Sequence, residues 1–401
     1  MKANKNTVFT QTMLTQTIGR REILKRGAVL GGALLLPNSF QAVAATPLTS
    51  RAAEAGIMRF RGVTYDVGTA YEVYEGPLSR TVWRPELLRR DMKAIREGLR
   101  CNVVTLYGTD IARLTEAAEV AFEHGLEVWL QPRLMGANER DRLEHLAEAT
   151  GAAETLRQYG SVTVNIGVEL SLFMTGIIPG KTFYEKAATL SQSRREDILA
   201  YKEKLDAHLE QAVTLTRSLF SGPLTYSAGE WEPIDWKPFD IIGHTFYRNA
   251  DNAATYPQML QEMKAQAQGK PVVITEFGSC TFEGAGDVGG MGWDIIDYSK
   301  AVPEIPDQFV RSERDQADTI AELLGLYEDA GLAGAFIYDF STPANPYNSD
   351  PKYDLDMASY GLVKPILRDN EREATHWEPK EAFERVAENY ERLEQQRDDE
   401  K

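Results

Sequence analysis

Short apolar runs alternate with longer segments of helical period from about residue 57 to the C-terminal region. Each run is bounded by Gly, Pro or polar residues, which is the pattern of a strand buried on both faces. Eight strands are predicted on this basis, at residues 58–65, 102–107, 127–131, 163–169, 224–227, 241–246, 272–277 and 335–339.

The segments between these runs repeat their apolar residues every three or four positions, as one face of a helix does. The first such segment follows Pro85 and carries its apolar residues at Leu88, Met92, Ile95 and Leu99. The same spacing predicts further helices over residues 114–122, 205–212 and 320–327, and from residue 379 to about 395.

Alternating strands and helices predict a parallel sheet, because each crossover returns the chain to the same end of the sheet. Eight repeats over about 340 residues fit an α/β fold of the (β/α)8 TIM-barrel type, which takes ~250 residues plus insertions. The alternative is a doubly wound open sheet. It is disfavoured because residues 62–68 carry no Gly-rich phosphate loop after the first strand.

Long segments rich in Gly, Pro and aromatic residues follow the fourth, seventh and eighth strands, at 171–190, 279–306 and 341–377. In a parallel barrel the loops that follow the strands all lie on the C-terminal rim. Long loops on one rim usually build a binding cleft. We therefore expect a single domain with its binding face at that rim.

The first 45 residues have the pattern of an export signal. Arg-Arg-Glu-Ile-Leu-Lys at residues 20–25 precedes an apolar run at 28–36, and Ala-Val-Ala at 42–44 offers a cleavage site. The run is far shorter than the ~20 residues that span a bilayer. The arginine pair resembles a twin-arginine signal, which predicts passage through the twin-arginine export machinery to the periplasm or the extracellular space. The predicted organisation is a signal at 1–45, a linker at 46–56, the barrel domain at 57–396 and a charged tail at 397–401.

The composition limits the kinds of partner that the protein is expected to bind. The chain has 401 residues, of which 43% are hydrophobic, and a net charge of −16. This charge disfavours nucleic acid and anionic membrane surfaces, and it fits a neutral or cationic substrate. Cys101 and Cys280 fall at opposite ends of predicted strands, so no disulfide is expected. The histidines and cysteines lack metal-ligand spacing, so we predict no metal site. We also predict that the protein has no cofactor, has no stable membrane anchor and is a monomer.

Two of the predicted strands end in a glutamate. The fourth reads Val-Asn-Ile-Gly-Val-Glu up to Glu169, and the seventh reads Val-Val-Ile-Thr-Glu-Phe-Gly around Glu276. Catalytic side chains of α/β barrels lie at the C-terminal ends of the strands. Two carboxyl groups there are the minimal set for cleaving a glycosidic bond.

In this hypothesis one carboxyl group is an ionised nucleophile, and the other is the acid and base with a raised pKa. Tyr247, at the end of the sixth strand, is placed to hydrogen-bond Glu276. Weaker candidates for substrate binding follow the other strands or flank Tyr247, and they are Tyr65, Asp66, Gln131, Arg133, Trp231, His244, Asn249, Tyr338 and Asp339. For each weaker candidate alone, packing or a loop hydrogen bond is the simpler interpretation. For the two glutamates together, catalysis is favoured over a rim salt bridge.

These strand ends resemble the retaining glycoside hydrolases of clan A. The resemblance rests on Glu169, on Thr-Glu-Phe-Gly around Glu276, and on Gly-His-Thr-Phe-Tyr up to Tyr247. It implies a (β/α)8 barrel that cleaves a carbohydrate substrate by double displacement, with Glu169 as the acid and base with a raised pKa and Glu276 as the ionised nucleophile. Two positions depart from the clan pattern. Val168 stands where an asparagine usually precedes the acid, and Thr105 lies where strand two usually carries an arginine.

Four stretches more narrowly resemble a bacterial barrel group often labelled abortive infection protein, at residues 168–174, 275–281, 356–363 and 377–381. That label names no reaction. Three hypotheses therefore stay open: an exported glycosidase, a non-catalytic carbohydrate-binding barrel in which Val168 marks lost chemistry, and a defence or interaction protein on a barrel scaffold.

Overall fold

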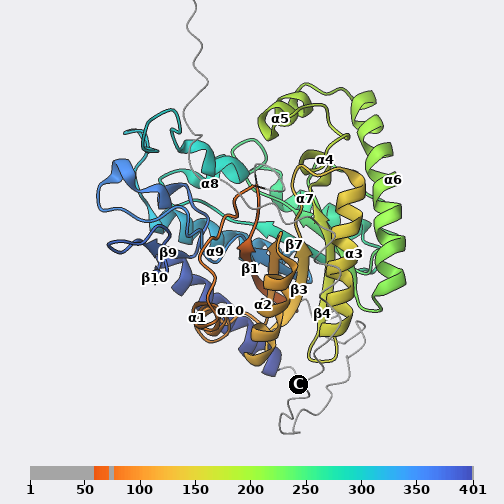
Figure 1. The fold of residues 1–401 in the computed structure, drawn as a ribbon, viewed down its shortest axis with the longest axis horizontal. Coiled ribbons are helices and arrows are strands. Elements are labelled where there is room, and N and C mark those ends of the chain that lie inside the picture. Colours follow the sequence, from red (N-terminus) through yellow and green to blue (C-terminus); the bar gives the residue numbers. More distant parts are fainter. Residues whose placement is uncertain (1–57, 72–75, 400–401) are drawn as a thin grey trace, which may run out of the picture. The chain divides into compact units, whose positions relative to one another are not determined.

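The computed structural model describes residues 58–71 and 76–399. At its centre is a closed barrel of eight parallel strands, in which each strand pairs with the next and the last closes on the first (Figure 1). The strands are β1 (Phe60–Gly68), β2 (Val103–Gly108), β3 (Glu127–Pro132), β4 (Val162–Val168), β5 (Leu224–Ala228), β6 (Ile242–Thr245), β7 (Val272–Phe277) and β8 (Gly334–Ile337). All eight predicted strands are present, so the (β/α)8 fold is confirmed and the open sheet is excluded.

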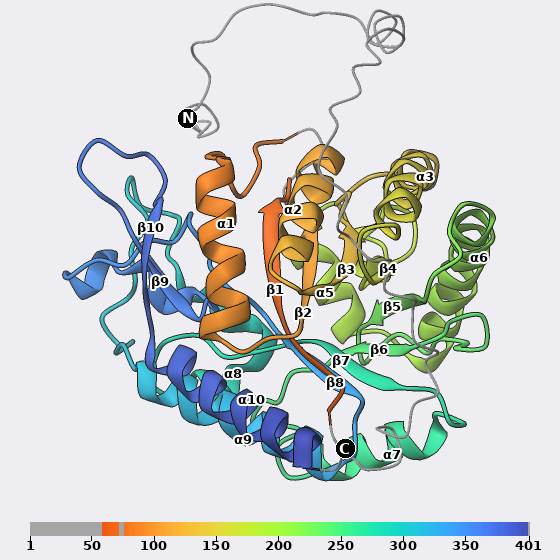
Figure 2. The same cartoon turned by 90° about the horizontal axis from the view of Figure 1, so that it is seen from below.

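Helices connect the strands and pack around the barrel (Figure 2). The helices that the sequence period indicated are α1 (Pro85–Lys93) with its π-helical continuation η3 (Ala94–Gly98), α2 (Ile111–Glu123), α6 (Arg195–Leu219), α9 (Glu313–Asp329) and α10 (Glu381–Asp399). The period did not indicate α3 (Glu139–Leu156) or α7 (Tyr256–Gln266). The buried face of α3 consists largely of small residues such as Ala149 and Ala153, so its apolar period is weak.

The ends of α2 show how local sequence sets these helices. The side chain of Asp110 accepts a hydrogen bond from the amide of Arg113 and caps the helix start. At the other end Gly125 adopts a left-handed conformation with φ 75°, which residues with a side chain disfavour. The amide of Leu126 then bonds to the carbonyl of Ala121, and the chain turns into β3.

The interior of the barrel nearer the N-terminal ends of the strands is apolar. Rings on strands that are not neighbours meet there, since Trp129 of β3 lies 4.6 Å from Phe336 of β8 and 5.2 Å from Phe60 of β1, centroid to centroid. The cluster is completed by Val103, Ile241 and Val273. Side chains alternate between the two faces of a strand, so every second residue points into the barrel. In β3 the next inward residue after Trp129, nearer the C-terminal rim, is the buried and polar Gln131.

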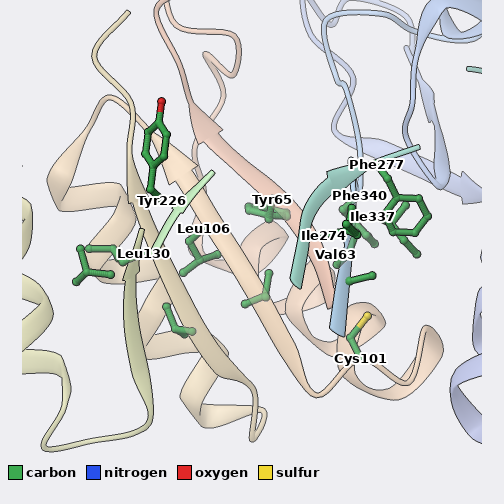
Figure 3. Packing of buried hydrophobic residues seen from close by; sticks show 14 of the residues in the cluster. Val63, Tyr65, Cys101, Leu106, Leu130, Tyr226, Ile274, Phe277, Ile337 and Phe340 are labelled. Atoms are coloured by element: carbon green, nitrogen blue, oxygen red, sulfur yellow. The ribbon is translucent and has the colours of Figure 1, made fainter. Parts of the chain in front are cut away.

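The opposite face of the strands packs against the helices. This larger core includes Val63, Leu106 and Ile337, which Figure 3 shows among their neighbours. Tyr65 belongs to the same outer core and is 1% exposed. Its hydroxyl donates to Oδ2 of Asp91 in α1 at 2.9 Å. Tyr65 therefore ties β1 to a helix outside the barrel.

The three long loops lie where the sequence predicted them. The β4 loop contains α4 (Leu170–Phe173) and α5 (Phe183–Ser191). The β7 loop contains α8 (Ala285–Val288) and η4 (Gly289–Ile295). The β8 loop contains two 3-10 turns and a two-stranded sheet, which lies beside α1 in Figure 2. Its elements are η5 (Pro351–Tyr353), η6 (Leu355–Ala358), β9 (Val363–Ile366) and β10 (His376–Pro379).

A buried ion network ties the β7 and β8 loops to α10. Lys380 and Asp356 are fully buried, with Nζ 2.9 Å from Oδ2. Lys380 also donates to Thr281 at 2.8 Å. Arg311 contacts Asp356 and Asp354 at 3.0 Å each. Because an unpaired buried charge costs several kcal/mol, about 3–5 when one partner is removed, this network fixes the relative positions of the two rim loops.

Several sequence expectations fall outside the described residues. These are the export signal at 1–45, the linker at 46–56 and the last residues of the tail. In the described part, α10 continues to Asp399. None of the helices in residues 58–71 and 76–399 has the length and apolar character of a membrane span. Cys101 and Cys280 are each buried and free.

Candidate active site

Glu169 and Glu276 lie at the C-terminal ends of β4 and β7, on the barrel rim. Glu169 directly follows β4 and precedes α4, with φ 43° and ψ 45°. Glu276 lies in β7, opposite Thr245 of β6 in the sheet register. Both glutamates are half-buried. The structure therefore brings the two predicted carboxyl groups to one end of the barrel.

The Glu169 carboxyl lies in surroundings that favour its neutral form. Burial raises the pKa of Glu169, the negative charge of Glu276 raises it further, and a hydrogen bond from Thr245 partly opposes them, leaving a pKa of about 8. The Thr245 hydroxyl donates to Oε1 of Glu169 at 2.5 Å. A carboxyl that keeps its proton near neutral pH has the state that a general acid needs.

The Glu276 carboxylate accepts one hydrogen bond on each oxygen. The hydroxyl of Tyr247 donates to Oε1 at 3.1 Å, and Nη2 of Arg133 donates to Oε2 at 3.1 Å. The predicted bond from Tyr247 is thus present. The Glu276 side chain is 15% exposed. A guanidinium and a phenol aimed at one carboxylate stabilise its negative charge and fix its orientation.

Arg133 is itself held in place from three sides. Its Nε donates to Oε1 of Gln131 at 2.7 Å, and its guanidinium carbon lies 3.7 Å from the centre of the Tyr107 ring. Burial lowers the pKa of Arg133 most, but Glu276 and the neighbouring Tyr71, Tyr107 and Tyr338 together raise it, and the net shift is upward. An arginine thus contacts Glu276 from the end of β3. The clan pattern places its arginine on strand two, where this chain has the buried Thr105.

A third carboxyl group lies beside Tyr107 and Tyr338. Asp339 is 3% exposed and accepts a hydrogen bond from Tyr107 at 3.3 Å. Burial and the neighbouring charge of Asp66 raise the pKa of Asp339 to about 7. Tyr338 carries its hydroxyl 3.3 Å from that of Tyr71. This corner of the rim is therefore polar, and the Arg133 guanidinium lies over the rings of both Tyr107 and Tyr338.

Two of the predicted binding residues point away from the barrel interior. Tyr65 faces α1 and Asp91, as described above. His244 packs against Trp236, with ring centroids 5.3 Å apart, and burial lowers the pKa of His244 to about 4. The prediction that these two bind substrate is corrected for a simple reason. In β1 and β6 the inward positions are the alternate residues, which are Asp66 and Thr245.

Three further candidates use their side chains within loops. Asp66 accepts hydrogen bonds from the amide of Gly68 and the hydroxyls of Thr69 and Ser79. The side chain of Asn249 accepts from the amides of residues 251 and 252 and closes a turn. The indole of Trp231 donates to the hydroxyl of residue 171 at 2.9 Å. The predicted site residues that the structure does place near one another at the C-terminal rim are therefore Glu169, Glu276, Tyr247, Arg133, Gln131, Tyr338 and Asp339.

Sequence reasoning missed the polar floor beneath the glutamates. Ser227 of β5 accepts a hydrogen bond from Asn165 of β4 at 2.6 Å and one from Gln131 of β3 at 3.3 Å. Thr245 was likewise missed as the partner of Glu169. The available signal was parity, because these residues alternate with the apolar outward positions of their strands. Val168 is buried, so a polar group is missing at the clan's asparagine position.

The closed barrel of eight parallel strands defines a fold class, the (β/α)8 barrels, and several solved glycoside hydrolases share this fold. A GH113 β-1,4-mannanase superposes with a TM-score of 0.54, at 13% identity over 84% of this chain and 99% of that chain. The GH113 β-mannanase of Alicyclobacillus acidocaldarius gives 0.51, at 16% identity over 85% and 99%. A β-glucuronidase from Ruminococcus gnavus gives 0.50, at 12% identity over 83% of this chain and 49% of its own. Identity this low establishes the fold alone.

No family model and no curated protein sequence matches the chain. The narrower resemblance to the abortive-infection group thus gains no support. Across residues 58–71 and 76–399, no group of three or more His, Cys, Asp or Glu residues is arranged to hold a metal ion.

Proposed function

We propose that this protein is a retaining glycosidase with Glu169 as acid and base and Glu276 as nucleophile. The observation that carries the proposal is the contrast between the two carboxyl groups. Glu169 is half-buried beside a like charge and has a pKa of about 8. Glu276 accepts hydrogen bonds from Arg133 and Tyr247. A carboxyl group with a raised pKa is suited to act as the acid, and a carboxylate oriented by a guanidinium and a phenol is suited to act as the nucleophile.

The reaction would proceed in two displacements. Glu276 attacks the anomeric carbon while Glu169 gives its proton to the leaving oxygen, so the glycosidic bond breaks and a glycosyl ester forms. The Glu169 carboxylate then takes a proton from water, whose oxygen attacks the same carbon and releases Glu276. The two inversions leave the anomeric configuration unchanged.

The substrate would be a neutral glycan. The β-mannanases named above act on a neutral polysaccharide, whereas a glucuronide carries a carboxylate that needs a cationic partner. In the described part of the rim, Arg133 is already paired with Glu276, and Asp66 and Asp339 lie close by. The net charge of −16 also disfavours an anionic substrate.

We also propose that the chain is exported, on the strength of the arginine pair, apolar run and small-residue site within residues 1–45. Mass spectrometry of the protein recovered outside the cytoplasm should find a new N-terminus near residue 45. Recovery of the intact chain only from the cytosol would refute export.

The proposed reaction is tested with chromogenic β-mannosides and β-glucosides and with mannan. Wild type is compared with Glu276→Gln, and Glu283→Gln serves as a matched control because Glu283 is exposed on the β7 loop. We expect turnover by wild type and the control, none by Glu276→Gln, and retention of the anomeric configuration by proton NMR. Binding of glycans without cleavage would favour the carbohydrate-binding barrel, and inversion would overturn the double displacement.

A further inference from the structure

The turn that follows Glu169 is clamped by residues of β5 and the loop after it. The amide of Leu170 donates to the hydroxyl oxygen of Tyr226 at 2.8 Å, and the amide of Ser171 donates to Oε1 of Glu232 at 2.9 Å. Tyr226 in turn donates to Oε2 of Glu232 at 2.8 Å. The first two amides of α4 are therefore bound by two linked side chains from another part of the chain.

The clamp is buried and fixed by its own loop. Glu232 is 6% exposed and Tyr226, labelled in Figure 3, is fully buried. Glu232 accepts a third hydrogen bond from the amide of Gly229 at 3.1 Å. Trp231 covers Gly229, where a Cβ would meet its ring at 2.6 Å, and donates its indole hydrogen to Oγ of Ser171 at 2.9 Å. The loop thus holds Ser171 by both its backbone and its side chain.

One of these amides, that of Ser171, could otherwise bind the Glu169 side chain. A residue at the start of a helix can accept, through its own side chain, a hydrogen bond from the second or third amide. In α4 the second amide is bound by Glu232, and the third, of Leu172, donates to the backbone carbonyl of Glu169. A carboxyl bound to such amides would be held in its ionised form. The Glu169 carboxyl instead accepts a hydrogen bond from Thr245 of β6.

We propose that Glu232 and Tyr226 are positioning residues for Glu169: Glu232, held by the hydroxyl of Tyr226, occupies the amide of Ser171 and so leaves the Glu169 carboxyl free to give its proton to a substrate. The clamp is remote from the reacting atoms and acts only through Glu169. This inference rests on the proposed function, in which Glu169 is the general acid.

The negative charge of Glu232 also raises the pKa of Glu169, as its hydrogen bond to the Ser171 amide does. The titratable and charged groups that act on Glu169 come from four strands or their following loops, and they are Glu276, Tyr247, Arg133, Tyr226 and Glu232. After burial, the charges of Glu276 and then Glu232 raise the pKa of Glu169, while Arg133 lowers it. Removing Glu232 would take away a like charge and free an amide, and both changes lower the pKa of Glu169.

The direct test is a titration of the Glu169 carboxyl by 13C NMR, in protein labelled at the glutamate side-chain carboxyl carbons. Glu169→Gln assigns the signal. Glu232→Gln keeps an acceptor for the Ser171 amide and removes the charge, whereas Glu232→Ala removes both. Glu230→Gln, exposed two residues away on the same loop, is the matched control.

We expect the Glu169 midpoint to fall in Glu232→Gln, to fall further, by about one unit or more, in Glu232→Ala, and to stay unchanged in Glu230→Gln. If Glu232→Ala does not fold, Glu232→Gln and Tyr226→Phe carry the test. An unchanged Glu169 midpoint in the folded variants overturns the proposal. This titration needs no turnover. It therefore tests whether Glu232 and Tyr226 control the pKa of Glu169 even if wild type cleaves no glycoside and the proposed function fails.

Kinetics separate positioning from general loss of structure. With a poor leaving group, Glu232→Ala should lower kcat at least ~10-fold with little change in KM, because protonation of the leaving oxygen is impaired. With a dinitrophenyl leaving group, which needs no proton, kcat/KM, which reports only the first displacement, should stay near the wild-type value. Glu232→Gln should recover most of the lost rate. Equal losses on both substrates would show a merely structural role and overturn the proposal.

Discussion

Replacing Glu169 by glutamine should stabilise the protein in a strongly pH-dependent way. The pKa of Glu169 is raised from an ordinary 4.5 to about 8, first by burial and then by the charge of Glu276. At low pH the carboxyl is neutral in both the folded and unfolded states and does not affect stability. Between the two pKa values the unfolded chain releases this proton while the folded chain keeps it, so the stability of the wild type falls as pH rises. Above pH 8 the loss is complete.

The magnitude follows from the shift. A rise from 4.5 to about 8 corresponds to on the order of 5 kcal/mol of destabilisation above pH 8. Glutamine keeps the volume and can still accept the hydrogen bond from Thr245, while it removes the charge. We therefore expect Glu169→Gln to match wild type near pH 4 and to exceed it by several kcal/mol at pH 9.

The assay is urea unfolding at pH 4, 6 and 9, followed by tryptophan fluorescence. Glu283→Gln, an exposed position on the β7 loop, serves as the control and should follow wild type at every pH. A difference between Glu169→Gln and wild type that is the same at all three pH values would refute the reasoning, because it would show that Glu169 does not carry a raised pKa.

Three further predictions concern the same site. Thr245→Val removes the hydrogen bond that lowers the pKa of Glu169, so the alkaline limb of kcat/KM should move up by about one unit; an unmoved limb in the pH–rate profile would contradict this. Arg133→Met leaves the Glu276 carboxylate without its ion-pair partner, so unfolding should become easier by about 3–5 kcal/mol, and turnover of glycosides should fall at least ~100-fold; full activity would show that Arg133 has no part in the site. Glu169→Gln should lose activity least with activated leaving groups and regain rate with azide, whereas Glu276→Gln should be inactive on all substrates; equal behaviour of the two variants would contradict their separate roles.

Most strands of the barrel could be predicted from single segments of the sequence. A buried parallel strand is apolar along its whole length, so each of the eight runs signalled its strand independently, and the strand ends placed Glu169 and Glu276 on one rim. The helix α3 was missed because its buried face depends on alanines, whose contribution to an apolar period is weak. Local patterns therefore sufficed wherever burial was strong and uniform.

The sequence by itself determined the eight strands and the two glutamates at strand ends, because hydrophobic period and strand position are properties of neighbouring residues, and it favoured a closed barrel over an open sheet. Only the tertiary structure decided which side chains meet. Tyr65 and His244 point away from the barrel interior because of their strand parity, and the packing of the two strand faces shows which parity faces inward. The contacts of Arg133 with Glu276 and of Glu232 with Ser171 join residues 143 and 61 positions apart. Such pairings arise from the closure of the barrel, and no local pattern in the chain encodes them.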